Sequence, residues 1–255
     1  MLGRIGRVAA VACARVRLAD VRIRRIVTTR EGGSSAPPYD SFNLGDRVGD
    51  DPRAVAANRK RLATELGLDP RNIAWMEQVH GRTVTVVDGP QDRSAEATDA
   101  LVTTTPGLAV AVLVADCVPV LLGDPDAGVV AAVHAGRVGA RIGIVPETLK
   151  AMLRLGAKPE RIEALLGPAV CGKCYEVPAD MAADVDKHLP GSRTTSRRGT
   201  PSLDLRAGLW EQLAAAGVGR IGVDPRCTME DKTLFSHRRE GVTGRQAALT
   251  WLEQE

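Results

Sequence analysis

The sequence predicts an α/β fold in which helices cover a mixed sheet, arranged as a single α/β/α sandwich. Short apolar runs typical of buried strands, such as residues 108–114 and 128–133, are interleaved with helical segments such as 146–155. Hydrophobic residues make up 44% of the 255 residues, which is enough for one sizeable core. The chain has no repeat and no clear linker, so we expect one domain over residues 21–255, preceded by an Arg-rich extension over residues 1–20.

The first 30 residues carry eight Arg and one acid, whereas the chain as a whole has a net charge of only +3. We interpret this segment as a solvated leader rather than a nucleic-acid arm, and its apolar run is too short for a signal peptide. Aromatic residues make up 3% of the chain, which leaves few stacking platforms for single-stranded nucleic acid. No apolar stretch is long enough to span a membrane. We therefore expect neither nucleic acid nor membrane as a partner.

The N-terminal part of the domain begins with a strand and ends with a helix. Residues 22–30 are rich in Val, Ile and Thr, which predicts a strand. Residues 31–51 contain Gly-Gly and Pro-Pro pairs and predict a long irregular loop, a feature that is usually functional or disordered. A helix over residues 53–66 follows, since Pro52 is a favoured first residue and Gly67 a favoured stop.

The middle of the chain predicts a series of strands. Alternation over residues 73–80 places Met76, Gln78 and His80 on one face. The β-branched and continuous apolar runs that follow predict strands over residues 83–87, 108–114, 118–122 and 128–133.

The C-terminal part predicts mostly helices. A helix over residues 146–155 begins at a proline and stops at a glycine, and a strand over residues 162–166 follows it. Further helices are predicted over residues 178–188, 204–216 and 242–253. Residues 191–201 are polar and predict an exposed loop.

Three metal-capable side chains lie at the ends of apolar strands or at breaks in them: His80, Cys117 and His134. Two imidazoles and one thiolate suit Zn²⁺, and three protein ligands leave one position open, which is the catalytic pattern. From spacing alone, a buried cysteine that acts as a small hydrophobe and hydrogen-bonded histidines remain the alternative.

A second cysteine motif, Cys171-Gly172-Lys173-Cys174, leaves three interpretations open. It can be a redox pair, half of a structural zinc site, or two thiols in a glycine-containing turn. No second CxxC motif accompanies it, and Cys227 stands alone in the sequence.

The motifs together resemble those of the laccase-domain family, also called the multicopper polyphenol oxidase-like or purine nucleoside phosphorylase family. The resemblance covers nearly the whole chain after residue 20. It rests on the segments TTREGGSSAPPYDSFNLGDRVGDDPRAVAANR (28–59), WMEQVHG (75–81), TDALVTTTPGLAVAVLVADCVPVLL (98–122), AAVHAG (131–136), GPAVCGKCYEV (167–177) and CTMEDKTLFSHRREGVTGRQAALTWL (227–252).

The resemblance implies a fold similar to the catalytic domain of cytotoxic necrotizing factor toxins, with His80, Cys117 and His134 as catalytic ligands of one Zn²⁺. It implies phosphorolysis of adenosine, inosine, guanosine and methylthioadenosine, together with adenosine deamination. One bacterial branch of the family is instead a peptidoglycan editing factor that removes serine from a muramic-acid precursor.

The segment HAGRVG departs from the family pattern HAGWRG, because Arg137 stands at the usual Trp position and Val138 at the usual Arg position. If that Arg contacts phosphate or substrate, Arg137 must supply the contact here. We assign phosphate or base contacts to Arg30 and Arg238, and ribose or base contacts to Asn43. A catalytically weakened nucleoside-binding protein is a further alternative.

The four histidines exclude a multicopper oxidase, which needs about ten histidine ligands around its coppers. Copper is at most a substitute in the zinc site. The five cysteines are odd in number and irregularly spaced, which predicts a reducing cytoplasm rather than a secreted disulfide framework. We expect a cytoplasmic monomer whose partners are a purine nucleoside and phosphate.

Overall fold

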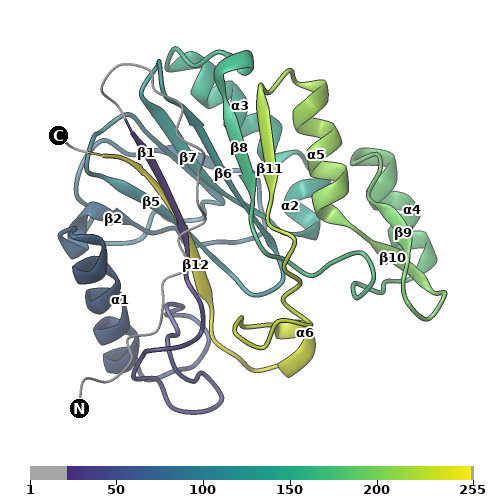
Figure 1. The fold of residues 1–255 in the computed structure, drawn as a ribbon, viewed down its shortest axis with the longest axis horizontal. Coiled ribbons are helices and arrows are strands. Elements are labelled where there is room, and N and C mark those ends of the chain that lie inside the picture. The colour runs from purple at the N-terminus through teal and green to yellow at the C-terminus, as the bar shows by residue number, and fades with distance from the viewer. Residues whose placement is uncertain (1–21, 254–255) are drawn as a thin grey trace.

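The computed structural model describes residues 22–253, so the expected extension over residues 1–20 lies outside the described part. The described strands form two stacked sheets and a small hairpin, with helices on both outer faces (Figure 1). No helix among the described residues is long and apolar enough to cross a membrane.

The larger sheet has six strands and carries the site described below. In spatial order its strands are β11 (Arg220–Val223), β8 (Glu163–Leu166), β6 (Val118–Asp124), β7 (Val129–Ala135), β4 (Ala100–Thr103) and β3 (Val84–Val86). Strand β7 runs antiparallel to β6 and β4, and β3 runs parallel to β4. The starts of β3, β4 and β6 and the end of β7 therefore lie at the same end of the sheet.

The smaller sheet has four strands. In spatial order they are β1 (Ile23–Val27), β12 (Gln246–Leu252), β5 (Ala109–Val114) and β2 (Ile73–Ala74). Strand β12 is antiparallel to both β1 and β5, and β2 is parallel to β5. The N-terminal and C-terminal strands of the described chain thus lie side by side in this sheet.

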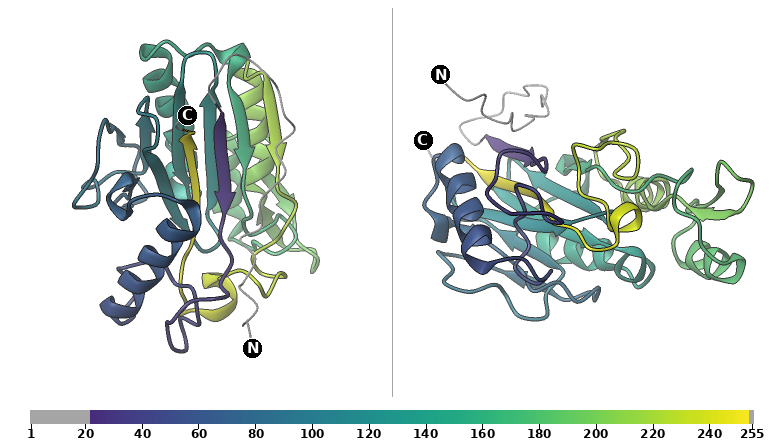
Figure 2. Two further views of the ribbon diagram at one scale, coloured as in Figure 1. Left: turned by 60° about the vertical axis from the view of Figure 1, so that its left-hand side comes forward. Right: turned by 90° about the horizontal axis from the view of Figure 1, so that it is seen from below.

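Alternation along β5 divides its side chains between two apolar layers, as expected for a strand. Val110 and Val112 pack between the two sheets. Ala109 and Ala111 face the other way, toward Leu62 of helix α1 (Pro52–Leu66). The edge view in Figure 2 shows α1 outside the smaller sheet.

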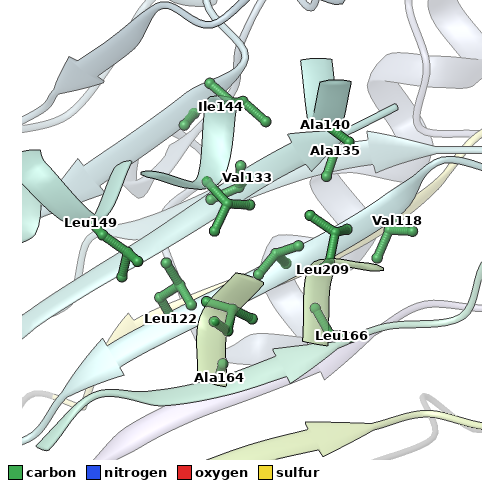
Figure 3. Packing of buried hydrophobic residues seen from close by; sticks show 14 of the residues in the cluster. Val118, Leu122, Val133, Ala135, Ala140, Ile144, Leu149, Ala164, Leu166 and Leu209 are labelled. Atoms are coloured by element: carbon green, nitrogen blue, oxygen red, sulfur yellow. The ribbon is translucent and has the colours of Figure 1, made fainter. Parts of the chain in front are cut away.

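Helices cover the outer face of the larger sheet and build the third apolar layer. They are α2 (Arg137–Arg141), α3 (Ile144–Arg154) and α5 (Leu205–Ala215). Figure 3 shows Leu149 of α3 against Leu122 of β6, and Leu209 of α5 near Leu166 of β8. Full burial of one such leucine stabilises the fold by about 2 kcal/mol.

The remaining elements lie beyond the sheets. Helix α4 (Ala179–His188) and the hairpin of β9 (Arg193–Thr195) and β10 (Pro201–Leu203) extend past the edge of the larger sheet (Figure 1). Short helical turns cover Pro70–Asn72 and Pro159–Arg161, and α6 (His237–Glu240) precedes β12.

The predicted mixed α/β class is confirmed, but the sheet count and several elements differ. Two stacked sheets replace the single predicted sheet, because a strand buried on both faces can pack against another sheet as well as against helices. The helix predicted over residues 242–253 is wrong: Gln246–Leu252 of this segment form β12, and every residue of that strand is buried. Pairing with β1 and β5 outweighs the helical preference of its Ala and Leu residues.

Smaller differences concern lengths and missed elements. The strand predicted over residues 73–80 ends at Ala74, and the loop predicted over residues 191–201 contains the β9–β10 hairpin. Four further short elements, β4, β11, α2 and α6, were not predicted from the sequence.

Candidate metal centre and active-site pocket

The structure brings His80, Cys117 and His134 together at the end of the larger sheet where β3, β4 and β6 begin and β7 finishes. Their ligand atoms all lie within 4.8 Å of one another. The Cys117 Sγ is 3.9 Å from the His80 Nε2, and the two imidazole rings are 4.7 Å apart at an interplanar angle of 75°. We call these three residues the first cluster.

Strand register explains why residues so distant in sequence converge. Cys117 immediately precedes β6, whose first residue, Val118, pairs with Ala135 at the end of β7. His134 is the neighbour of Ala135, so its side chain lies beside the start of β6. His80 comes from the loop before β3 and has a left-handed backbone (φ 59°), a conformation that for a non-glycine residue is typical of functional sites.

The Asp99 carboxylate, just before β4, orients both histidines. It lies 2.8 Å from Nδ1 of His134, and it accepts backbone N–H bonds from Val79, His80 and Gly81. Burial raises the pKa of Asp99, but the bonds from His134 and Gly81 lower it below its usual range. An N–H at Nδ1 leaves the His134 Nε2 lone pair for a metal, which is the usual carboxylate–histidine–metal arrangement.

The thiol of Cys117 and the imidazole of His134 stabilise each other's charged forms. Burial raises the pKa of Cys117, but His134 and His80 outweigh burial and lower it to about 6. Burial lowers the pKa of His134, but Cys117 and Asp99 outweigh burial and raise it to about 9. A thiolate at neutral pH is what metal coordination and nucleophilic attack both require.

The first cluster leaves room for a metal ion because Gly136 has no side chain. A Cβ at Gly136 would lie 2.8 Å from Cδ2 of His80 and 3.0 Å from Sγ of Cys117. With two nitrogens and one sulfur around this space, the donor set suits Zn²⁺, and three protein ligands leave a fourth position for water or substrate. The residues present therefore fit a catalytic metal ion.

Asp116 connects the first cluster to the loop that follows β11. Its carboxylate accepts hydrogen bonds from Thr228 Oγ1 (2.6 Å), Ser236 Oγ (2.7 Å) and the backbone N–H of Arg238 (2.6 Å). Asp116 also has a positive φ of 92°. These bonds hold the residue before Cys117 in a strained conformation and fix the start of α6 above the cluster.

A pocket of about 140 Å³ opens beside Cys117. Its lining residues are Ala115, Asp116, Cys117, Arg137, Val170, Tyr175, Leu205, His237 and Arg238. The Arg238 guanidinium lies 5.0 Å from the centre of the Tyr175 ring. Burial raises the pKa of Tyr175, and the positive charges of Arg137 and Arg238 oppose that rise. The pocket thus combines a thiolate, two guanidinium groups and one aromatic ring.

Of the four residues assigned to substrate, the structure brings Arg137 and Arg238 to this pocket but not Arg30 or Asn43. The Arg30 guanidinium contacts Glu240 at 2.6 Å and the Asp40 carbonyl at 2.9 Å. Asn43 is fully buried, and its side-chain amide bonds to backbone and carboxylate groups of the protein.

Four residues of the site were not predicted from the sequence: Asp99, Asp116, Tyr175 and Arg245. Burial lowers the pKa of Arg245, while the negative charges of Cys117 and Asp116 raise it, so this guanidinium also lies near the first cluster. The sequence does contain a signal for the two aspartates. Asp99 immediately precedes an apolar strand, and Asp116 immediately precedes Cys117, which itself precedes one. Tyr175 and Arg245 carry no comparable signal.

Known proteins align with nearly the whole chain. A family model described as multi-copper polyphenol oxidoreductase laccase matches residues 24–253. A Mycobacterium tuberculosis protein named purine nucleoside phosphorylase is 61% identical over 233 residues, which cover 91% of this chain and 93% of that protein. A Corynebacterium glutamicum protein with the same name is 62% identical over 235 residues, covering 91% and 96%.

Solved structures agree in fold. The Bacillus licheniformis hypothetical protein YfiH superposes with a TM-score of 0.84 at 33% identity, covering 91% of this chain and 93% of that one. YlmD from Geobacillus stearothermophilus gives a TM-score of 0.84 at 34% identity, covering 91% and 92%. This chain therefore belongs to the laccase-like family described as multi-copper polyphenol oxidoreductases.

Proposed function

We propose that the protein is a purine nucleoside phosphorylase whose first cluster holds Zn²⁺. One observation carries this proposal: Cys117 belongs both to the His–Cys–His cluster and to the pocket that contains Arg137 and Arg238. A metal ion and a phosphate group would therefore be held against the same substrate. The relatives named purine nucleoside phosphorylase, at 61–62% identity, support it.

The pocket residues have complementary tasks in phosphorolysis. Arg137 and Arg238 hold the phosphate dianion, because guanidinium groups bind phosphate through paired N–H donors. The phosphate oxygen attacks C1′ of the nucleoside as the bond to the base breaks, which yields the free base and a pentose 1-phosphate. Tyr175, whose ring lies against Arg238, presents an apolar face to the base.

Bound zinc would supply a Lewis acid that polarises an oxygen or lowers the pKa of a water. The chain's own residues prepare the site for it. Asp99 fixes the orientation of His134, and the backbone bonds from Val79, His80 and Gly81 to Asp99 fix the loop that carries His80. We expect adenosine, inosine, guanosine and methylthioadenosine to be substrates.

Arg137 takes over the role of the arginine that the family has at the next position. It lines the pocket as the first residue of α2, while Val138 is 37% exposed. A cation at the pocket is therefore retained despite the HAGRVG segment. Replacing Arg137 by Ala should raise KM for phosphate by roughly 10- to 100-fold, because one charge-assisted hydrogen bond contributes about 1.5–3 kcal/mol.

The test is chromatography of purified protein incubated with inosine or adenosine, with and without phosphate, beside the His80→Ala variant. We expect phosphate-dependent hypoxanthine and adenine, and neither with the variant. Inosine formed from adenosine without phosphate would establish the adenosine deamination that the resemblance implies. Nucleoside binding in calorimetry without any product would contradict the proposal and favour the weakened nucleoside-binding protein.

The aligned groups Cys117, His134 and Asp99 favour a second candidate, a peptidoglycan-editing amidase. A thiolate beside an imidazolium that a carboxylate orients is the arrangement of a cysteine nucleophile. Cys117 would attack the amide carbonyl, His134 would protonate the departing amine, and water would hydrolyse the thioester. Incubation with a serine-bearing muramyl nucleotide discriminates, because only this reaction releases free serine.

The unpaired thiols of the described cysteines suit a reducing compartment, and the cytoplasm is our proposal for it. Cys117 needs its thiolate for either reaction, so oxidation there would stop turnover.

A further inference from the structure

A second group of metal-capable side chains lies outside the first cluster. It consists of Cys171, Cys174, Cys227 and Glu230, whose ligand atoms all lie within 4.8 Å of one another. We call these four residues the second cluster. Neither phosphorolysis nor amide cleavage uses them.

The second cluster is built from two short turns that face each other. In the first, the backbone N–H of Cys174 donates to the Cys171 carbonyl at 2.9 Å. In the second, the N–H of Glu230 donates to the Cys227 carbonyl at 3.0 Å. Each turn therefore presents two ligand side chains, three residues apart, on the same side. The pattern is C-x-x-C followed by C-x-x-E.

The fold itself holds the two turns in register. They follow β8 and β11, which are parallel neighbours in the larger sheet and so end at the same edge. Ala169 and Cys227 form a bridge, and the N–H of Thr228 donates to the Ala169 carbonyl at 3.2 Å. Backbone contacts therefore hold the two turns together, without the help of flexible side chains.

Backbone N–H groups are directed at one sulfur atom of the second cluster. The N–H of Cys171 donates to the Sγ of Cys227 at 3.4 Å, and the N–H of Met229 is directed at the same sulfur. Backbone N–H groups that donate to ligand atoms orient and stabilise them around a metal ion.

We propose that the second cluster is a structural zinc site with three cysteine ligands and one carboxylate ligand. Four protein donors close the coordination sphere, which is the structural pattern, whereas the first cluster leaves one position open. Tetrahedral zinc places its sulfur ligands ~3.8 Å apart. The observed separations need only a contraction of about 1 Å or less at the widest pair.

A redox disulfide is the competing explanation, and it accounts for fewer of the contacts. A Cys171–Cys174 bond would leave Cys227 and Glu230 without a role, although the Cys174 Sγ lies 3.5 Å from the Glu230 carboxylate. Arg197 also forms an ion pair with Glu230. A carboxylate has two oxygens, so this ion pair does not exclude coordination.

The site would fasten one wall of the active-site pocket. Tyr175 directly follows Cys174, and Thr228, which bonds to Asp116, directly follows Cys227. Zinc at the second cluster would therefore clamp together the loop that carries Tyr175 and the loop that leads to Arg238. It would act on the reaction only through the position of these residues.

Metal content of the full-length protein, expressed with zinc and purified without chelator, provides the test. We expect two zinc ions per chain in the wild type, one in Cys117→Ala and one in Cys171→Ser. With cobalt(II) in place of zinc, the sulfur-to-metal charge-transfer absorption should fall far more in Cys171→Ser than in Cys117→Ala, because the second cluster supplies three of the four thiolates.

A measurement on the wild type keeps the test decisive even where Cys171→Ser does not fold. Zinc should protect Cys171, Cys174 and Cys227 from iodoacetamide in peptide mapping, and chelation should expose them. Glu230→Gln should weaken binding at the second cluster by roughly 10-fold or more. A single zinc per chain that disappears in Cys117→Ala would overturn the proposal. So would a Cys171–Cys174 disulfide in protein purified under reducing conditions.

Discussion

The two clusters use the same kinds of ligand atoms but have opposite surroundings. In the first, one thiol lies between two imidazoles, and they bring the pKa of Cys117 down to about 6 despite its burial. In the second, three thiols lie side by side: burial raises the pKa of Cys174, and Cys171 and Cys227 raise it further. The thiolate of the first cluster is therefore stabilised without a metal ion. In the second cluster, a thiolate is disfavoured unless a cation balances its charge.

The two clusters also differ in their position relative to the pocket. The first cluster lies at the pocket, beside Arg137 and Arg238. The second lies behind the pocket wall, between the turns after β8 and β11. The comparison separates a centre built for reaction from one built for stability, and the variants below test that separation.

The largest expected effect comes from Cys117→Ala. Two remaining ligands hold zinc poorly, and loss of several kcal/mol of Lewis-acid stabilisation lowers kcat by at least ~10³-fold. The midpoint of thermal unfolding should change little. Cys171→Ser should lower the midpoint by roughly 10 °C if about 4 kcal/mol of metal-linked stability is lost. Its loss of kcat should be far smaller than that of Cys117→Ala, because the second cluster acts on the reaction only through the position of the pocket wall. Equal losses of activity and stability in both variants would contradict the division of roles.

Asp99→Asn should weaken zinc binding at the first cluster by about 10–100-fold, because the amide is a poorer acceptor for His134 and for the three backbone N–H groups. Competition with a chelator measures the affinity of each site. Asp124→Asn is the matched control, since Asp124 is also a buried carboxylate but bonds to Lys158 and Arg161 at the far end of β6. An equal loss in the control would mean that general destabilisation, and not orientation of His134, is the cause.

Much of this organisation was predictable from the sequence, and the reasons for the failures are local. Positions at the ends of apolar runs, or at breaks in them, made His80, Cys117 and His134 candidates for one metal site but left ordinary packing as the alternative. The family resemblance was needed to place the three residues in one cluster. The second cluster was not predictable, since pairing of β8 with β11 brings Cys227 to the CxxC turn and β11 itself was not recognised. The sequence of β11 has little apolar alternation, and all four of its residues are partly exposed or exposed.

The helix predicted over residues 242–253 failed for a related reason. Ala and Leu favour helices locally, but β12 lies between β1 and β5. Only an extended segment can form hydrogen bonds with both of these strands. Local preference decides a segment only where tertiary pairing does not.

Glycine substitutions should disturb one cluster at a time, with smaller effects. A Cβ at Gly136 would meet His80 and Cys117 at 2.8–3.0 Å, so Gly136→Ala should weaken the first zinc site by about 10-fold. A Cβ at Gly172 would meet Asp204 and Thr194 at 2.8 Å, so Gly172→Ala should displace the CxxC turn and weaken only the second. Gly89→Ala, with nothing within 4 Å, is the control, and metal content of each variant is the measurement.

The smallest effect is a shift in the pH dependence of thiol reactivity in metal-free protein. Cys117 faces His80 and His134, and its charge also acts on Tyr175 and Arg245. Its pKa is lowered, so alkylation by iodoacetamide should be slow below pH 6, rise as pH increases through about 6, and then level off.

Cys174 and Cys227 of the second cluster should behave differently in the same sample, since the pKa values of both are raised. They should begin to react only above the range of an ordinary thiol, near 8.5. His134→Ala removes the main cation beside Cys117, so its midpoint should move up toward that ordinary value. A Cys117 midpoint near 8.5 in the wild type would show that the imidazoles do not stabilise the thiolate. The electrostatic difference between the two clusters would then be absent, and only their ligand geometry would separate them.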